Sequence, residues 1–327
     1  NTRSHSELGS QAFLRRWYFV LRHGRVGHCQ AITQMKNIII VTGGAGFVGS
    51  NLIELLIKNT KFNILSIDNY STGSKFNHLN SRRVKYIKGS TLNISRILNK
   101  YKKSISSLFH FGEFARIYQS FKNFNECLES NSHGTKEVFK FCLDNKIKLI
   151  YSATSASLGH GGKDKNLSPY AFTKSKNLEL LENLKKWFKF KFEIIYFYNV
   201  YGKRQIMRGE MATVIGIFEN QYLNNKPLTV VRPGSQTRRF THISDTVNIC
   251  YKAWKLNKCA HYSISHHEAY SIIQTAKMFK RNIKYLPSRE GERYASALTN
   301  ISLNNKVFKN FGKISLKDYI SSFIKGH

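Results

Sequence analysis

Cysteine, acidic residues and long apolar runs are all scarce in this chain of 327 residues. Its five cysteines lie far apart and form no Cys-x-x-Cys pair, which argues against a disulfide framework or a zinc site and favours a reduced, cytoplasmic protein. No apolar run approaches the length needed to cross a bilayer, so we expect no membrane segment. Because His266 and His267 are adjacent and His110 and His242 are isolated, none with ligand spacing, we predict no metal site.

The scarcity of acids leaves a formal net charge of +33, from 52 lysines and arginines against 19 acidic residues. A charge of this size would suit a nucleic-acid or anionic-membrane partner. The basic residues are spread along the chain, however, and no zinc-finger spacing or RNA-recognition motif accompanies them. We therefore interpret the charge as a lysine-rich composition together with a site for a pyrophosphate, and we expect no nucleic-acid partner.

Residues 1–34 differ in composition from the rest of the chain, since they hold five arginines, one acid and no lysine. Lysine dominates from residue 36 onward, and Met35 stands directly before a strand-like run. An artefact of cloning or sequencing, a transit peptide and a genuine extension all fit this break, and we favour the artefact. We expect 1–34 to be disordered and exclude it from the fold.

Apolar runs alternate with helical periodicity through the first two-thirds of the chain. This alternation predicts an α/β fold of Rossmann type, a doubly wound parallel sheet with helices on both faces. The pattern becomes irregular after about residue 201, with short strand-like pieces at 228–231 and 262–265. We predict a cofactor-binding domain at 35–200 and a mainly substrate-binding lobe at 201–327, partly interleaved with it. The expected strands of the first domain are 37–42, 62–68, 84–88, 107–111, 147–152 and 192–199.

Gly43, Gly46 and Gly49 are spaced as Gly-x-x-Gly-x-x-Gly between a predicted strand and a predicted helix. Glycines in such a turn let the backbone approach a pyrophosphate, and the helix N-terminus offers unpaired N–H groups to it. Asp68 ends the second strand, 19 residues after Gly49. A carboxylate there accepts hydrogen bonds from ribose hydroxyls and repels a 2′-phosphate, so the pattern predicts a dinucleotide and favours NAD over NADP.

Tyr170 and Lys174 lie four residues apart, hence on one face of the helix that Ser168 and Pro169 are expected to start. A free tyrosine ionises at a pKa of about 10. A nearby ammonium and the positive nicotinamide would favour the phenolate. The spacing alone is weak evidence, because three other Tyr–Lys pairs share it. The position of this pair after a strand that ends in the hydroxyl cluster at 152–157 favours a role in proton transfer.

With these residues assembled, the chain resembles the extended short-chain dehydrogenase/reductases, and within them the UDP-glucose 4-epimerase-like group of NAD-dependent epimerases and dehydratases. The similarity runs from about residue 36 to the C-terminus. It rests on the segments TGGAGFVGSNL (42–52), DNYSTG (68–73), HFGEFARI (110–117), SATSASLG (152–159), SPYAFTK (168–174), NVYGKRQ (199–205), GSQTRRFTHISD (234–245) and REGE (289–292).

The resemblance implies roles for individual residues. Thr154 matches the catalytic hydroxyl of the family, Tyr170 its base and Lys174 the partner of that base. The implied cofactor site consists of Gly43, Gly46, Phe47, Val48, Asp68, Asn69, Ser74, Phe111, Gly112, Asn131, Tyr170, Lys174 and Phe197. The implied substrate site consists of Thr154, Asn199, Arg238 and Arg289, in which the two arginines grip the nucleotide diphosphate.

The implied fold is a Rossmann domain with a smaller C-terminal substrate-binding domain. The implied assembly is a homodimer through two long helices, here at 116–145 and 168–188. The implied partner is a nucleotide-sugar substrate, and the implied cofactor is NAD.

We therefore expect an NAD-dependent epimerase of a nucleotide-diphosphate sugar, of the UDP-glucose 4-epimerase type, that works through a keto-sugar intermediate. In the related 4,6-dehydratases an Asp-Glu pair follows the catalytic threonine, whereas Ser155 and Ala156 follow it here, which disfavours dehydration. The chain departs from the family at 112–115, where a glutamate stands among residues that are usually small.

Three alternatives stay open. The segments 208–213 and 292–294 also resemble ADP-heptose 6-epimerases, which leaves the sugar and the base of the substrate undecided. An NAD(P)-dependent sugar-nucleotide reductase would use the same proton-transfer chemistry. Outside the enzymes, the charge would suit a basic nucleotide- or RNA-binding relative.

Overall fold

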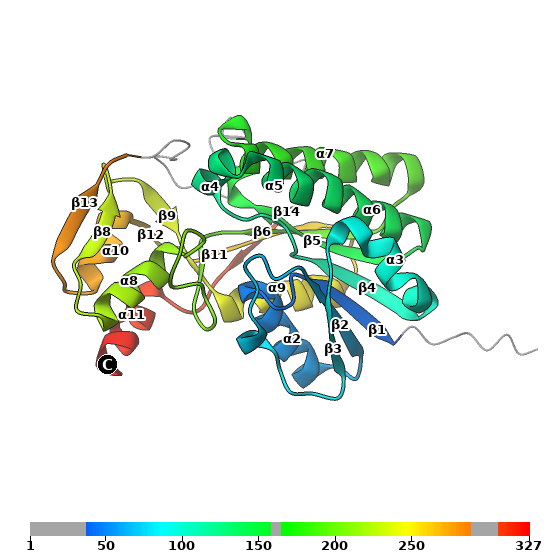
Figure 1. The fold of residues 1–327 in the computed structure, drawn as a ribbon, viewed down its shortest axis with the longest axis horizontal. Helices are drawn as coiled ribbons and strands as arrows, with labels where there is room; N and C mark the ends of the chain where they lie inside the picture. The colour runs from blue at the N-terminus through cyan, green and yellow to red at the C-terminus, as the bar shows by residue number, and fades with distance from the viewer. Residues whose placement is uncertain (1–36, 158–164, 289–306) are drawn as a thin grey trace, which may run out of the picture. The chain divides into compact units, whose positions relative to one another are not determined.

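The computed structural model describes residues 37–157, 165–288 and 307–327, so the proposed leader at 1–34 lies outside the described residues (Figure 1). The largest element is an eight-stranded sheet with the order β14-β11-β6-β5-β4-β1-β2-β3, in which all neighbouring strands are parallel. Its strands are β1 (Ile38–Thr42), β2 (Asn63–Asp68), β3 (Val84–Lys88), β4 (Ile105–His110), β5 (Lys148–Thr154), β6 (Phe192–Phe197), β11 (His261–Ser265) and β14 (Val307–Phe311).

Helices cover both faces of this sheet (Figure 1). One face carries α2 (Phe47–Asn59) and α9 (Ile243–Leu256). The other face carries α3 (Ile94–Leu98), α6 (Thr135–Asp144) and α7 (Pro169–Phe188). The remaining helical segments on this side are α4 (Ile117–Lys122), α5 (Phe124–Leu128) and the π-helical turn η4 (Glu129–Gly134). The chain also contains three short 3₁₀ turns, η1 (Lys75–Asn77), η2 (Thr91–Asn93) and η3 (Asn99–Ser104).

The apolar run of β1 explains why the sheet is covered on both faces. Successive side chains of a strand point to opposite faces. Ile39 and Val41 pack in the same core cluster as Leu52 of α2, whereas Ile40 packs in the other cluster with Phe139 of α6. All five side chains are at most 1% exposed, which is the burial expected of a parallel strand between two helical layers.

The predicted Rossmann-type parallel sheet is confirmed, and each of the six expected strands is present with its ends shifted by at most two residues. The strand-like piece at 262–265 is β11 of the main sheet, where Tyr262 and Ile264 are buried, so the C-terminal part of the chain contributes to that sheet. One detail differs. The helix expected at 116–145 is interrupted at Asn123, whose φ of −111° and ψ of 50° are not helical.

The C-terminal part of the chain also forms a smaller lobe with its own apolar core. Its helices and strands are β7 (Val200–Tyr201), α8 (Val214–Leu223), β8 (Leu228–Val231), β9 (Thr237–Arg239), β10 (Thr241–His242), β12 (Ala269–Ser271), α10 (Ile272–Met278), β13 (Ile283–Leu286) and α11 (Leu316–Lys325). Phe218, Val230 and Phe279 are fully buried in this core. No helix among the described residues combines the length and apolar character that a membrane span requires.

Helix α7 begins as the sequence predicts. The Ser168 Oγ accepts a hydrogen bond from the Ala171 N–H at 3.1 Å, and Pro169 occupies the first turn, where its missing N–H costs nothing. The helix ends at Lys189, whose φ of 54° is left-handed. The cap therefore fixes the start of the helix that carries Tyr170 and Lys174.

We expect Ser168→Ala to lower the free energy of unfolding by about 1 kcal/mol, because it removes the acceptor for a helix N–H. Ser175→Ala on the same helix is the control, since the Ser175 hydroxyl only donates to the Phe172 carbonyl, and it should change stability by less than about 0.5 kcal/mol. Urea unfolding of both variants measures the difference. Equal effects would show that the cap does not stabilise α7.

Candidate active site

The candidate functional side chains lie at the carboxyl ends of the parallel strands. Thr42, Asp68, His110, Thr154 and Phe197 are the last residues of β1, β2, β4, β5 and β6. Parallel strands bring their carboxyl ends to one edge, and ligands bind where the strand order reverses, here between β1 and β4. A cavity of about 1040 Å³ lies at this edge.

The cavity collects most of the predicted site. The predicted residues that line it are Gly43, Gly46, Phe47, Val48, Asp68, Asn69, Phe111, Gly112, Thr154, Tyr170, Lys174, Phe197, Asn199 and Arg238. Ser74 and Asn131 do not line it, and Arg289 lies outside the described residues. Ser74 caps the turn η1, while the fully buried Asn131 amide binds both backbone groups of Phe114.

The glycine turn requires glycine for steric reasons. Gly43 has a φ of +69°, and a Cβ on it would lie 2.8 Å from the carbonyl carbon of Phe111. A Cβ on Gly49 would lie 2.2 Å from the Gly43 carbonyl oxygen, so the start of α2 packs directly on the turn. Gly46 is less crowded, with a single atom within 4 Å of such a Cβ, and it lines the cavity. The turn thus exposes backbone N–H groups at the N-terminus of α2 to a phosphate.

Asp68 lies beside this turn. Its carboxylate accepts the Ala45 N–H at 2.9 Å and the Tyr70 N–H at 2.8 Å. Burial raises the pKa of Asp68, and these backbone N–H groups act in the opposite direction. Each carboxylate oxygen keeps acceptor capacity toward the cavity, which fits the ribose hydroxyls of NAD and opposes a 2′-phosphate.

Two aromatic rings form part of the cavity wall. Phe111 and Phe197 meet edge to face, with ring centroids 5.7 Å apart. Both line the cavity. A flat apolar wall in this place suits a planar ring such as nicotinamide.

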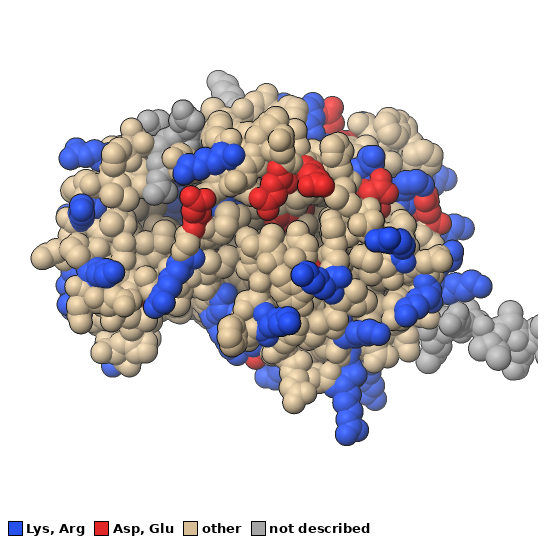
Figure 2. All heavy atoms as spheres, viewed as in Figure 1, with Lys and Arg blue, Asp and Glu red and all other residues tan. Residues whose placement is uncertain are grey.

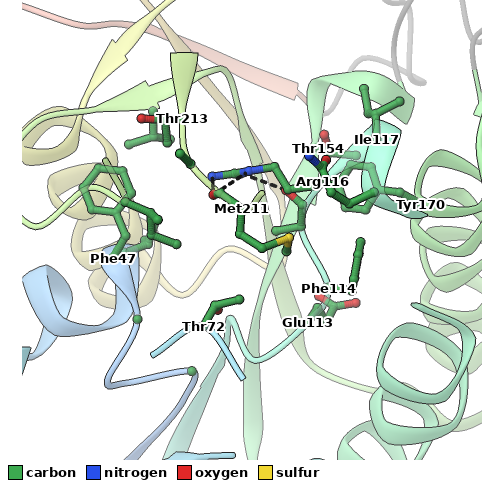
Figure 3. Close-up of a pocket in the computed structure, with 18 of the residues that line it drawn as sticks. Phe47, Thr72, Glu113, Phe114, Arg116, Ile117, Thr154, Tyr170, Met211 and Thr213 are labelled. Atoms are coloured by element: carbon green, nitrogen blue, oxygen red, sulfur yellow. Dashed lines mark hydrogen bonds between the residues drawn. The ribbon is translucent and has the colours of Figure 1, made fainter. Parts of the chain in front are cut away.

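Thr154 and Tyr170 lie on the same side of the cavity, across from Phe47 and Thr213 (Figure 3). Thr154 ends β5, and its hydroxyl accepts the Ala156 N–H at 3.2 Å. Tyr170 belongs to the first turn of α7, one helical turn before Lys174. The structure therefore brings the three residues predicted for proton transfer to one cavity.

Lys174 has a partner that sequence reasoning did not assign. Its Nζ donates to the Ser152 carbonyl at 2.6 Å and forms an ion pair with Glu113, while the Lys174 and Glu113 side chains are only 4% and 2% exposed. The glutamate was visible in the sequence as the exception within 112–115. Its contact with Lys174 was not predictable, because it joins residues 61 apart in sequence.

A buried hydrogen-bond network continues from Glu113. Its Oε1 accepts the Thr135 hydroxyl at 3.0 Å. The Thr135 hydroxyl lies 3.0 Å from His110 Nε2, and His110 Nδ1 lies 2.7 Å from the Thr42 hydroxyl. Since Thr135 donates to Glu113, His110 Nε2–H donates to Thr135 and the Nδ1 accepts from Thr42. Burial lowers the pKa of His110 to about 4, which keeps this imidazole neutral.

Arg116 connects the loop after β4 with the C-terminal lobe (Figure 3). Its Nε and one terminal nitrogen donate to the Met211 carbonyl at 3.0 and 2.6 Å. Gln119, one helical turn later, donates to the Glu210 carbonyl at 2.5 Å. These bonds connect the segment 209–213, which lines the cavity, to the loop after β4 and to α4.

Charge is distributed unevenly around the site. Figure 2 shows basic side chains dispersed over the face in view, and acidic ones gathered near the hollow in its middle. Glu126, Glu129 and Glu210 line the cavity. Among residues 37–157, 165–288 and 307–327, no group of three or more His, Cys, Asp or Glu side chains is placed to hold a metal ion.

Comparison with known proteins agrees with this geometry. The model of a family described as the NAD dependent epimerase/dehydratase family matches residues 39–272. A putative UDP-glucose 4-epimerase of Methanocaldococcus jannaschii is 28% identical over 88% of this chain and 97% of that protein. An ADP-L-glycero-D-manno-heptose-6-epimerase of Brachyspira hyodysenteriae is 29% identical over 76% of this chain and 81% of that protein. The structure of a UDP-glucuronic acid 4-epimerase of Bacillus cereus with UDP-glucuronic acid and NAD has a TM-score of 0.74, at 26% identity over 88% of this chain and 99% of that one.

The lowered pKa of His110 predicts a pH dependence of stability. An unfolded histidine takes up a proton at a pKa of about 6.5, whereas the buried imidazole does so at about 4. Between these values the unfolded state binds more protons, so stability is lost as the pH falls from 6.5 towards 4, by about 3 kcal/mol from this group. Urea unfolding across this range measures the loss.

His110→Gln should show a correspondingly smaller loss of stability over the same pH range, whatever its stability at neutral pH. His133→Gln, which removes an exposed imidazole, controls for the loss of a histidine and should keep the slope of the wild type. A wild-type slope in His110→Gln would refute a neutral buried His110.

Proposed function

The chain belongs to the NAD-dependent epimerase/dehydratase family, and from this premise we propose that it is a sugar-nucleotide epimerase of the UDP-glucose 4-epimerase type. Its cofactor is NAD. The observation that carries the proposal is that Thr154, Tyr170 and Lys174 line the same cavity as the glycine turn and Asp68. The glycine turn and Asp68 would hold the dinucleotide in the cavity that Tyr170 also lines.

The proposed reaction inverts one carbon of the sugar. Tyr170 takes the proton of the sugar hydroxyl, Thr154 binds the oxygen that becomes the keto group, and the Lys174 ammonium favours the phenolate. When bound, NAD would supply reversible hydride chemistry at that carbon. The keto sugar turns over in the cavity before Tyr170 gives the proton back, so no net oxidation occurs.

Dehydration is the weaker possibility within the family. Ser155 and Ala156 follow Thr154, so no acid stands beside it in the chain. Glu113 does line the cavity, but its oxygens are engaged by Lys174 and by hydroxyl groups inside the protein. A carboxylate held in this way does not act as the acid that a departing hydroxyl requires.

The substrate we propose is a UDP-hexose, bound through its diphosphate by Arg238 and Asn199, which line the cavity, and by Arg289. A second candidate is an ADP-heptose. It is supported by the Brachyspira hyodysenteriae relative and by the position of residues 209–213 on the cavity wall.

We further propose a homodimer through the helical regions at 116–145 and 168–188, the second of which contains α7. Phe124, Leu167 and Phe172 line a shallow apolar groove there and are 49%, 47% and 43% exposed. Large exposed apolar side chains that lie together are typical of protein–protein contacts. Sedimentation equilibrium of the protein tests this assembly.

Incubation of the purified protein with UDP-glucose, UDP-galactose, their N-acetyl forms, UDP-glucuronic acid and an ADP-heptose tests the proposed activity. Chromatography of the products should reveal one epimeric pair at equilibrium without net consumption of NADH. Steady oxidation of NADH with a keto-sugar nucleotide would identify a reductase instead. A salt-dependent RNA complex without turnover of any sugar nucleotide would identify a binding protein.

Tyr170→Phe should lower kcat by about 10³-fold, because it removes the group that transfers the proton. NAD release on denaturation should stay at the wild-type level, since the glycine turn and Asp68 are unchanged. Tyr251→Phe is the matched control: Tyr251 has the same spacing to a lysine, Lys255, but lies on α9 outside the cavity. Near-normal activity of Tyr170→Phe would exclude Tyr170 as the base.

A further inference from the structure

We propose that Glu113 is a positioning residue, which keeps the buried Lys174 amine charged and fixes its position in the cavity. In this way Glu113 allows Tyr170 to act as a base near neutral pH. This inference rests on the proposed function, in which Tyr170 and Lys174 form the proton-transfer pair. It assigns a role to the glutamate that distinguishes this chain at 112–115.

Lys174 needs an anion because of where it lies. Its side chain is 4% exposed, and its other contacts, the Ser152 carbonyl and the Tyr151 ring centred 4.8 Å away, carry no net charge. A buried ammonium without a counter-ion loses its proton, because the neutral amine avoids the cost of desolvation. Glu113 is the acid that forms an ion pair with Lys174 among the described residues.

Glu113 is itself held rigidly. Besides the ion pair through Oε2, its Oε1 accepts from the Tyr151 hydroxyl at 3.0 Å, from the Thr135 hydroxyl at 3.0 Å and from the Asn177 amide at 3.3 Å. Burial raises the pKa of Tyr151 well above its usual range, so its hydroxyl remains a donor. The donors come from β5, α6 and α7, so three elements fix the position of one carboxylate.

The other titratable groups near this pair cannot replace the carboxylate. Burial keeps His110 neutral and raises the pKa of the Cys127 thiol to about 11, so the thiol stays protonated. Arg116 is positively charged and lies within electrostatic reach of Tyr170. The other groups near the pair, Tyr151 from β5, His110 from β4 and Cys127 from α5, are uncharged. The carboxylates of Glu126 and Glu129 line the same cavity, but among the described residues the ion pair of Lys174 is with Glu113.

The consequence appears in the pH dependence of the reaction. With Glu113 in place, the charged Lys174 favours the Tyr170 phenolate, and the base works at a moderate pH. Without the carboxylate, Lys174 becomes neutral inside the protein and that support is lost. The phenolate then forms only at higher pH.

The test uses two substitutions at one position. Glu113→Gln keeps the shape but removes the charge, and it should lower kcat at neutral pH by at least about 10-fold and move the acidic limb of the kcat profile to higher pH. Glu113→Asp keeps the charge but shortens the side chain, and it should lower kcat without moving that limb. KM for the sugar nucleotide should change less than about threefold in both variants, since substrate binding lies elsewhere.

Glu179→Gln is the matched control. Glu179 lies on α7 and pairs with Lys176 at 2.8 Å, but both side chains are more than half exposed. It should leave kcat and its pH profile unchanged, because a solvated lysine keeps its charge without a partner. Thermal unfolding and the amount of bound NAD identify any variant that has lost its fold.

A second readout does not depend on turnover. In protein with ¹³C-labelled lysine, the Cε chemical shift reports whether each amine is protonated, and a Lys174→Arg spectrum assigns the signal. Lys174 should be an ammonium at pH 8 in the wild type and in Glu113→Asp, and a neutral amine in Glu113→Gln.

An ammonium at position 174 in Glu113→Gln, or an acidic limb that stays in place or moves to lower pH, would overturn the inference. These outcomes are distinct from failure of the proposed function. If the proposed function fails, the wild type itself turns over no sugar nucleotide, while the lysine spectrum still reports on the role of Glu113.

Discussion

The ion pair between Lys174 and Glu113 is the interaction on which the arrangement of the site depends. Two charges removed from water are costly unless the remaining donors and acceptors of both groups are satisfied. Here Lys174 also donates to the Ser152 carbonyl. Glu113 also accepts hydrogen bonds from the Tyr151 hydroxyl, the Thr135 hydroxyl and the Asn177 amide. From Glu113 the hydrogen bonds continue through Thr135 and His110 to Thr42, the last residue of β1. This chain of bonds connects α7 to the strand that precedes the glycine turn.

The parallel sheet makes this connection possible. Thr42, His110 and Thr154 are the last residues of three neighbouring strands, and they lie together at the carboxyl edge of the sheet. Each strand contributes one of these side chains to the site. The Thr42 hydroxyl also accepts the N–H groups of Phe111 and Gly112, both at 3.1 Å, which fixes the start of the loop that carries Glu113. One network therefore positions the glycine turn, the loop after β4 and the helix α7.

Local patterns in the sequence predicted the elements but not their long-range contacts. Apolar runs bounded by turns gave the strands, because burial on both faces leaves a clear signal, and Ser168 with Pro169 gave the start of α7. The short β11 is predicted as a strand, but four or five residues do not reveal which sheet they join. The break at Asn123 was missed because the helical periodicity continues on either side of it. Glu113 was noticed as an exception, but its partner lies on another element.

The small number of acids makes the buried ones informative. In a chain with 52 basic residues and 19 acids, a carboxylate inside the protein has to be retained against a large desolvation cost. Each one has a defined structural partner: Asp68 accepts N–H groups beside the cofactor turn, and Glu193 accepts those of residues 259 and 260 where β11 begins. Glu219 binds the Gln205 amide and the Tyr319 hydroxyl in the smaller lobe. Glu113 differs from them because it pairs with Lys174, so under the proposed function its charge bears on the chemistry as well as on the fold.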